Sequence, residues 1–227
     1  MTTAAGWAEK TLRYRFRDPA RLDQALTHRS AGGRHNERLE FLGDAVLGLI
    51  IAETLYRAQP DATEGYLTRL RARLVRKETL AQIGAELRLG DWLRLGQGEL
   101  KSGGFRRASI LANGVEAVLG AVYLDGGLEQ ARLMVTTLYG DRLCTLPADE
   151  ELKDPKTRLQ ERLQALGRDL PVYAIEDVSG EAHKRHFSVS CEVPAMGLRT
   201  EASGRSRREA EQKAAEAMIG ELEHERT

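Results

Sequence analysis

Residues 37–56 read ERLEFLGDAVLGLIIAETLY, a run with the length and apolar content of a long helix. Its middle, residues 45–52, carries no charge on any side, so we expect it to be buried nearly all round. A second run, ASILANGVEAVLGAVYL at residues 108–124, has Glu116 as its single charge and is typical of a core helix. Together the two runs predict an all-helical core.

The rest of the chain predicts two domains of different class. Apolar residues keep a spacing of three and four through residues 21–143, as in an all-α domain. The acidic, proline-containing stretch LPADEE, residues 146–151, is typical of a boundary. We therefore expect a helical domain at 1–145, a linker at 146–153 and a second domain at 154–225.

The second domain has the pattern of a small α+β (α-β-β-β-α) module. Apolar residues alternate in three short segments, and a helical pattern stands on either side of them. That order predicts helices covering one face of an antiparallel sheet. The predicted elements are a helix at 155–166, strands at 172–178, 187–193 and 198–202, and a helix at 206–223.

Composition excludes several classes of protein. The 227 residues include 34 basic and 34 acidic ones, so a uniformly basic binding module is excluded. Cys144 and Cys191 lack metal-ligand spacing, and we expect both to be unpaired thiols in a reducing compartment. We see neither a membrane span of ~20 apolar residues nor an apolar signal core, so we expect a cytoplasmic protein with no membrane partner.

Acidic residues stand at unusual places in both long runs. At 100° per residue, Glu37, Glu40 and Asp44 fall within about 60° of one another on one helix face. Favourable placement of acids near a helix amino terminus explains Glu37 better than Asp44. Glu116 stands alone in its apolar run, and Asn113 lies on the same face.

These oxygen-bearing side chains predict a metal site where the two runs pack together. Alone, Glu116 is equally well explained as a buried glutamate paired with an arginine or with backbone groups. Converging, Glu40, Asp44, Asn113 and Glu116 form a set of hard oxygen donors, the type that Mg²⁺ prefers. Such a site suits phosphodiester hydrolysis, although it does not name the substrate.

Residues 36–45, NERLEFLGDA, resemble the signature of bacterial ribonuclease III. Further stretches match that family in order: ALTHRS at 25–30, EG at 64–65, GELKSGG at 98–104, and residues 109–116. Beyond the linker, DPKTRLQE at 154–161, GEAH at 180–183 and SRREAE at 206–211 resemble the family's double-stranded-RNA-binding domain. The resemblance covers nearly the whole chain.

The resemblance implies an endonuclease that cuts double-stranded RNA with Mg²⁺, for which Mn²⁺ can substitute. It implies a homodimer in which each subunit cuts one strand, leaving 5′-phosphate and 3′-hydroxyl ends, in the processing of ribosomal and other structured RNA precursors. By position, Asp44 and Glu116 match the catalytic acids, and Glu40, Asn113, Asp44 and Glu116 match the metal ligands. Glu37 and Glu64 resemble supporting acids. Phe41 resembles a dimer contact, although its periodicity fits a core aromatic equally well.

One departure concerns Asn113, because the family usually has Asp at this position. An amide oxygen can still ligate Mg²⁺, but a formal charge is lost. One alternative is therefore a non-catalytic double-stranded-RNA-binding protein with the same fold. A second is a metal-dependent phosphohydrolase of small nucleotides, which leaves the second domain unexplained.

The resemblance also implies how RNA is held. Duplex RNA offers a shallow minor groove and its phosphates to a binding module. Glu211 stands where many such domains have lysine, so we expect weaker phosphate binding. A solvated helix face and an ordinary loop histidine are the alternatives for the polar residues. The implied minor-groove contacts are Gln160, Glu161, Gln164 and His183, and the implied phosphate contacts are Arg205, Arg207, Arg208 and Lys213.

Overall fold

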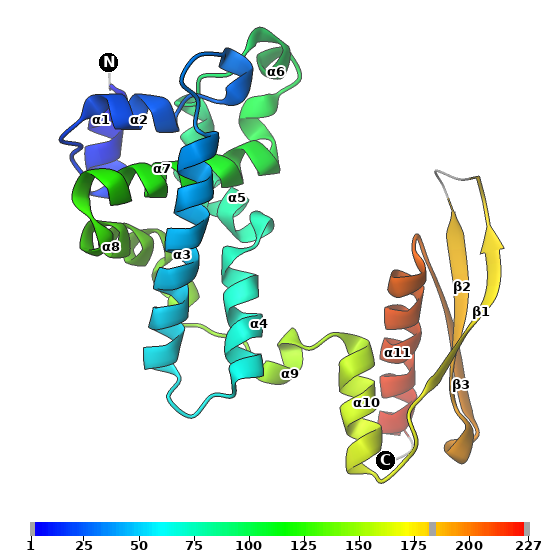
Figure 1. Ribbon diagram of the computed structural model, residues 1–227. Helices are drawn as coiled ribbons and strands as arrows, with labels where there is room; N and C mark the ends of the chain where they lie inside the picture. Colours follow the sequence, from blue (N-terminus) through cyan, green and yellow to red (C-terminus); the bar gives the residue numbers. More distant parts are fainter. Residues whose placement is uncertain (1–2, 182–184, 225–227) are drawn as a thin grey trace. The chain divides into compact units, whose positions relative to one another are not determined.

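The computed structural model describes residues 3–181 and 185–224 and divides the chain into two compact units, Met1–Pro147 and Ala148–Thr227. The first unit is helical, as predicted (Figure 1). Its α-helices are α1 (Ala4–Trp7), α2 (Pro19–Ala25), α3 (Glu37–Ala58), α4 (Glu64–Val75), α5 (Lys77–Glu86), α6 (Gln97–Lys101), α7 (Ala108–Gly126) and α8 (Leu128–Tyr139).

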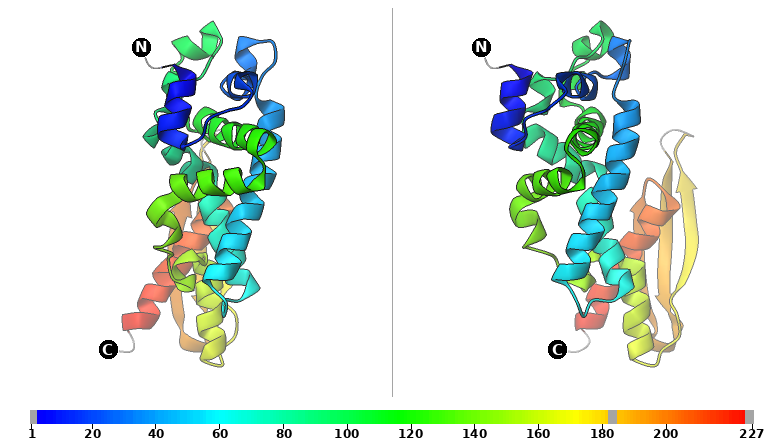
Figure 2. Two further views of the ribbon diagram at one scale, coloured as in Figure 1. Left: turned by 90° about the vertical axis from the view of Figure 1, so that its left-hand side faces the viewer. Right: turned by 60° about the vertical axis from the view of Figure 1, so that its left-hand side comes forward.

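Helix α7 forms the core of the first unit, and α3 crosses it (Figures 1 and 2). The crossing is close because glycines stand on both helices, where a side chain would have no room. A Cβ added at Gly43 of α3 would lie 1.8 Å from the carbonyl oxygen of Glu116, and one added at Gly120 of α7 would lie 2.3 Å from that of Leu39. Backbone therefore meets backbone beside the acidic residues.

Asp125, near the end of α7, has a buried side chain that forms hydrogen bonds with the amino-terminal segment. Asp125 accepts hydrogen bonds from the Tyr14 hydroxyl (2.7 Å) and from the backbone N–H groups of Arg17 (2.8 Å) and Asp18 (3.1 Å). Asp18 in turn caps α2, since its carboxylate accepts from the N–H of Ala20. This network holds the start of the chain against the core helix.

The predicted burial of residues 45–52 on all sides is wrong. The buried face of α3 includes Ile50 and Ile51, but Leu49 is 55% exposed. Phe41 and Tyr56 on the same helix are 80% and 74% exposed. Among the described residues of the first unit, the other helices cover only one side of α3, so Phe41, Leu49 and Tyr56 form an exposed apolar strip. The exposure of Phe41 excludes its interpretation as a core aromatic.

By length and composition α7 passes as a candidate membrane span, the single one in the part of the chain that the structure describes. However, 61% of its apolar window is buried inside the protein. That burial is what a core helix of a helical domain requires.

The second unit has the predicted order of helix, three strands and helix. Its elements are α9 (Asp149–Leu152), α10 (Pro155–Ala165), β1 (Val172–Ser179), β2 (His186–Val193), β3 (Leu198–Gly204) and α11 (Arg207–His224). The strands form an antiparallel sheet in the order β1-β2-β3 within the described residues. Its core joins α10, β2 and α11 through side chains such as Leu163, Cys191 and Met218. Asp154 caps α10, and Pro155 occupies its first turn.

The sheet pairs residue by residue, apart from one irregularity in β1. The register shifts between Ile175 and Asp177, and the extra residue, Glu176, accepts a 2.6 Å hydrogen bond from the Ser190 hydroxyl.

Cys191 is buried and Cys144 is exposed, and both are free thiols, as expected.

Candidate active site and RNA-binding face

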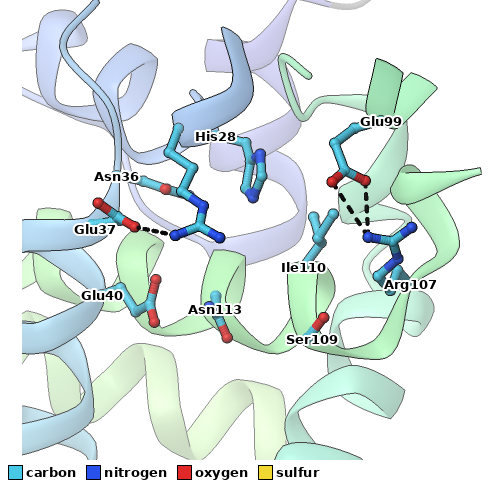
Figure 3. A pocket seen from close by; sticks show the side chains of 10 residues that line it. His28, Asn36, Glu37, Glu40, Glu99, Arg107, Ser109, Ile110 and Asn113 are labelled. Carbon is cyan, nitrogen blue, oxygen red and sulfur yellow. Dashed lines mark hydrogen bonds and ion pairs between the residues drawn. The ribbon is translucent and has the colours of Figure 1, made fainter. Parts of the chain in front are cut away.

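The first turns of α3 and α7 border a polar cavity of about 340 Å³ (Figure 3). Glu37 and Glu40 reach it from α3, and Ser109 and Asn113 reach it from α7. Of the predicted site residues, Glu37, Glu40 and Asn113 thus line one cavity, whereas Asp44 and Glu116 are not among its lining residues.

Glu40 and Asn113 line the same cavity (Figure 3). The Asn113 side-chain amide acts to lower the pKa of Glu40 and so opposes a larger rise. Burial is the largest cause of that rise, and the neighbouring charges of Glu37 and Asp44 add to it, so the pKa of Glu40 lies above its usual value. The amide therefore stabilises a carboxylate that its surroundings otherwise disfavour.

Glu116 lies one turn further along α7 and is more strongly perturbed. Burial, then the charges of Asp44 and Glu40, raise its pKa to about 7. In residues 3–181 and 185–224, no lysine, arginine or histidine forms an ion pair with any of these three acids. The three carboxyl groups at the α3–α7 crossing are therefore close together, and no ion pair among the described residues neutralises them.

The cations nearest the cavity are already paired at its rim. Arg29 bonds Glu37 at 3.2 Å, and Arg107, the residue before α7, bonds Glu99 at 3.0 Å (Figure 3). His28 lies between these pairs, and burial lowers its pKa. His28, Arg29 and Glu99 were not among the predicted site residues, although their segments, ALTHRS and GELKSGG, carry part of the resemblance.

The donor chemistry fits a divalent cation. Three coupled carboxylates and a neighbouring amide supply hard oxygen ligands, and a cation would relieve their mutual repulsion. As the side chains stand, no three His, Cys, Asp or Glu residues of the described chain are grouped closely enough to hold a metal ion. Asp44 is exposed rather than turned into the cavity.

Glu64 and part of the exposed strip of α3 line a second cavity. This cavity has a volume of about 440 Å³ and is mainly apolar, with Leu49, Tyr56 and Leu67 among its lining residues. Glu64, in the first turn of α4, also lines it and accepts a 2.9 Å hydrogen bond from Thr68. Glu64 is therefore not gathered with Glu40 and Asn113 in the polar cavity.

On the second unit, the predicted minor-groove residues of α10 face solvent. Gln160, Glu161 and Gln164 are all exposed. Glu161 is held by the ammonium of Lys153, which also bonds Glu150 at 2.7 Å. His183 lies outside the described residues.

The predicted phosphate contacts stand together at the beginning of α11. Arg205, Arg207, Arg208 and Lys213 are all exposed. Lys213 bonds Glu209 at 2.8 Å, and Arg207 bonds Glu211 at 2.7 Å. Exposed cations thus stand at the positive end of the helix dipole, a combination that suits anions.

Two family models match the chain. Residues 18–143 match the ribonuclease-III-like model, and residues 155–222 match the double-stranded RNA binding motif. The chain is 55% identical to ribonuclease 3 of Alkalilimnicola ehrlichii, over 100% of both chains. It is 52% identical to ribonuclease 3 of Vibrio cholerae, over 98% of this chain and 99% of that one.

Solved structures agree with the first unit. The nuclease domain of ribonuclease III from Campylobacter jejuni matches with a TM-score of 0.59 and 39% identity, covering 61% of this chain and 98% of that one. Both predicted fold classes are thereby confirmed, and the family depends on a divalent metal ion. The chain belongs to the ribonuclease III family and is a double-strand-specific endoribonuclease, with a helical nuclease domain followed by a double-stranded-RNA-binding domain.

Proposed function

We propose that this endoribonuclease uses Mg²⁺, with Mn²⁺ as a substitute, at the crossing of α3 and α7. The observation that carries the proposal is the state of Glu116: burial, and then the charges of Asp44 and Glu40, raise its pKa to about 7, and it has no basic ion-pair partner among the described residues. Mg²⁺ needs few protein ligands and leaves positions for water and phosphate oxygens. The acids supply that kind of site.

In this proposal each side chain has a separate role. Glu40, Asn113, Asp44 and Glu116 hold the cation, and Asp44 and Glu116 act at the scissile phosphate. The bound metal ion would lower the pKa of a water molecule and stabilise charge on the phosphate. Asn113 also lowers the pKa of Glu40 and so favours the ionised form that binds a cation. Glu37 supports the site by holding Arg29 at the cavity rim.

We further propose that two copies of the nuclease domain associate through the exposed strip of α3. Phe41, Leu49 and Tyr56 expose large apolar surfaces there, which a second copy would remove from water. The related Campylobacter jejuni structure is described as having a region involved in dimer formation. Glu64 lies at the same face as a supporting acid, and each copy would cut one strand.

The second domain would hold the duplex for cutting. Its exposed Gln160, Glu161 and Gln164, with His183, would meet the minor groove, while the basic start of α11 would meet phosphates. A linker at 146–153 would join it to the nuclease domain. Cleavage leaving 5′-phosphate and 3′-hydroxyl ends would process ribosomal and other structured RNA precursors in the cytoplasm.

Cleavage of a long labelled RNA duplex tests the proposal. The full chain should shorten the duplex with Mg²⁺ or Mn²⁺ and leave it intact in EDTA. The Asp44→Asn variant should bind the duplex without shortening it. Duplex binding with no cleavage at any Mg²⁺ or Mn²⁺ concentration would contradict the proposal and point to a non-catalytic binding protein with Asn113 as the cause.

A small-nucleotide phosphohydrolase would give a different result. A chain lacking residues 148–227 would then hydrolyse its substrate as fast as the full chain does. We expect instead that this truncation slows duplex cleavage, because the duplex-binding domain is lost.

A further inference from the structure

Glu211 in α11 holds two cations from two helices. One carboxylate oxygen accepts a 2.6 Å hydrogen bond from Lys156 Nζ in the first turn of α10. The other accepts a 2.7 Å hydrogen bond from Arg207 Nε in the first turn of α11. Lys156 Nζ also lies 4.2 Å from the ring centroid of Tyr173 on β1. The bridge thus joins both helices next to the sheet.

The exposure of the three side chains is unequal. The Glu211 side chain is 11% exposed, whereas those of Lys156 and Arg207 are 35% and 61% exposed. An approaching polyanion would therefore meet the two cations rather than the carboxylate. The expectation that Glu211 weakens phosphate binding rested on its residue type alone, whereas its side chain is largely buried behind the two cations.

The carboxylate stays ionised in this position. Burial raises the pKa of Glu211, but the hydrogen bonds from Lys156 and Arg207 outweigh it, so the pKa lies below its usual value. With two cations and one anion, the bridge carries a net positive charge. Because Glu211 engages Nε of Arg207, the terminal nitrogens of the guanidinium are left to form a fork toward a phosphate.

We propose that Glu211 is a positioning residue that fixes Arg207 and Lys156 for contact with RNA phosphates, and that Lys156 is an additional phosphate contact of this domain. The inference rests on the proposed binding of duplex RNA through the basic start of α11. Fixing two long, flexible side chains before RNA arrives reduces the entropy lost on binding. This role accounts for the presence of a largely buried acid, Glu211, at a surface proposed to bind RNA phosphates.

The test compares Glu211→Gln with Glu216→Gln in the full chain, with duplex RNA affinity measured in EDTA to prevent cleavage. Glu216 lies on the same helix and bonds Arg158 at 3.1 Å, so both variants remove one negative charge from α11. If these acids act only by repelling RNA phosphates, both variants should bind RNA as tightly as the wild type or more tightly. If Glu211 positions the two cations, Glu211→Gln should bind about three- to tenfold more weakly than the wild type, and Glu216→Gln should not.

Comparison of a double variant with a triple variant shows whether Glu211 acts through the two cations. In a chain that already carries Lys156→Met and Arg207→Ala, adding Glu211→Gln should cause no further loss of affinity. Lys156→Met alone should lower the slope of log affinity against log salt by about one, as expected for one lost phosphate contact. An unchanged slope would overturn the role of Lys156, and an unchanged affinity of Glu211→Gln would overturn the role of Glu211.

A further variant covers the case in which Glu211→Gln does not fold. Arg207→Lys retains the charge but has no guanidinium to bond Glu211 and a phosphate at the same time, so it should bind RNA more weakly than the wild type. Equal affinity would overturn the positioning of Arg207. If the wild-type chain itself fails to bind duplex RNA, the proposed function fails rather than this inference.

Discussion

Gly43 of α3 lies directly against the carbonyl oxygen of Glu116 in α7. A Cβ at Gly43 would lie 1.8 Å from that oxygen, a separation that no side chain tolerates. The contact fixes how close the acids of α3 come to Glu116. The geometry of the proposed metal site is therefore set by a residue that has no side chain.

Replacing Gly43 with alanine should damage both stability and cleavage. The added methyl group forces α3 and α7 apart, and overpacking of this kind costs about 1–3 kcal/mol of unfolding free energy. Duplex cleavage should fall more than duplex binding, because the second domain is untouched. Urea unfolding and a cleavage assay measure the two effects.

Gly48→Ala is the matched control on the same helix. No neighbouring atom lies within 4 Å of a Cβ built there, so alanine should raise helix stability by up to about 1 kcal/mol. Equal behaviour of the two variants would show that the α3–α7 contact does not govern the site.

Local patterns predicted most of the fold. The helices that became α3 and α7 were predicted to within two residues at each end, since periodicity and length are properties of the segment itself. The strands were predicted to within two residues for the same reason. The exposed side of α3 could not be predicted, because Leu49 has apolar neighbours in sequence but no helix packed over it.

The site was predicted by residue type rather than by arrangement. Acids sharing one helix face pointed to Glu40 and Asp44, and a lone acid in an apolar run pointed to Glu116, since a buried carboxylate is costly. The pairing of Arg107 with Glu99 depends on how separate segments meet, which sequence spacing does not give. The ion pair between Glu211 and Lys156 could not be predicted from sequence spacing either, because the two residues lie on different helices.

The metal-free chain should lose stability as pH rises. Glu116 has a usual pKa of 4.5 and a folded pKa of about 7. Between these values the folded state binds more protons than the unfolded state, so the free energy of unfolding falls as pH rises, by about 3 kcal/mol in total. The sign is thus opposite to that of a salt-bridged acid.

Urea unfolding in EDTA at pH 5 and pH 8 measures this loss. The two tryptophans of the chain, Trp7 and Trp92, both lie in the helical unit, so their fluorescence reports on that unit. Glu116→Gln should remove most of the pH dependence, whereas Glu129→Gln, at an exposed acid of α8, should retain it. A wild-type chain that is equally stable at both pH values would contradict the raised pKa.

Asn113→Asp should lower the Mg²⁺ concentration needed for half-maximal cleavage severalfold. The substitution adds a carboxylate to the metal-binding set and strengthens its attraction for the cation. In EDTA the same variant should be less stable than the wild type at pH 8, because an amide that favours the ionised form of Glu40 is replaced by a carboxylate that repels it. An unchanged Mg²⁺ requirement would show that the asparagine does not weaken the site.

Phe41→Ala should weaken association between two copies without destabilising one copy. The Phe41 side chain is 80% exposed, so its truncation costs the isolated domain less than about 0.5 kcal/mol. In a symmetric dimer each copy contributes its Phe41 to the interface, so the substitution removes two side chains. The dimer dissociation constant should therefore rise at least tenfold. Sedimentation over a range of concentrations measures that constant, with Leu133→Ala as the control because Leu133 is 60% exposed on α8. A Phe41→Ala chain that dimerises like the wild type would exclude the α3 strip as the interface.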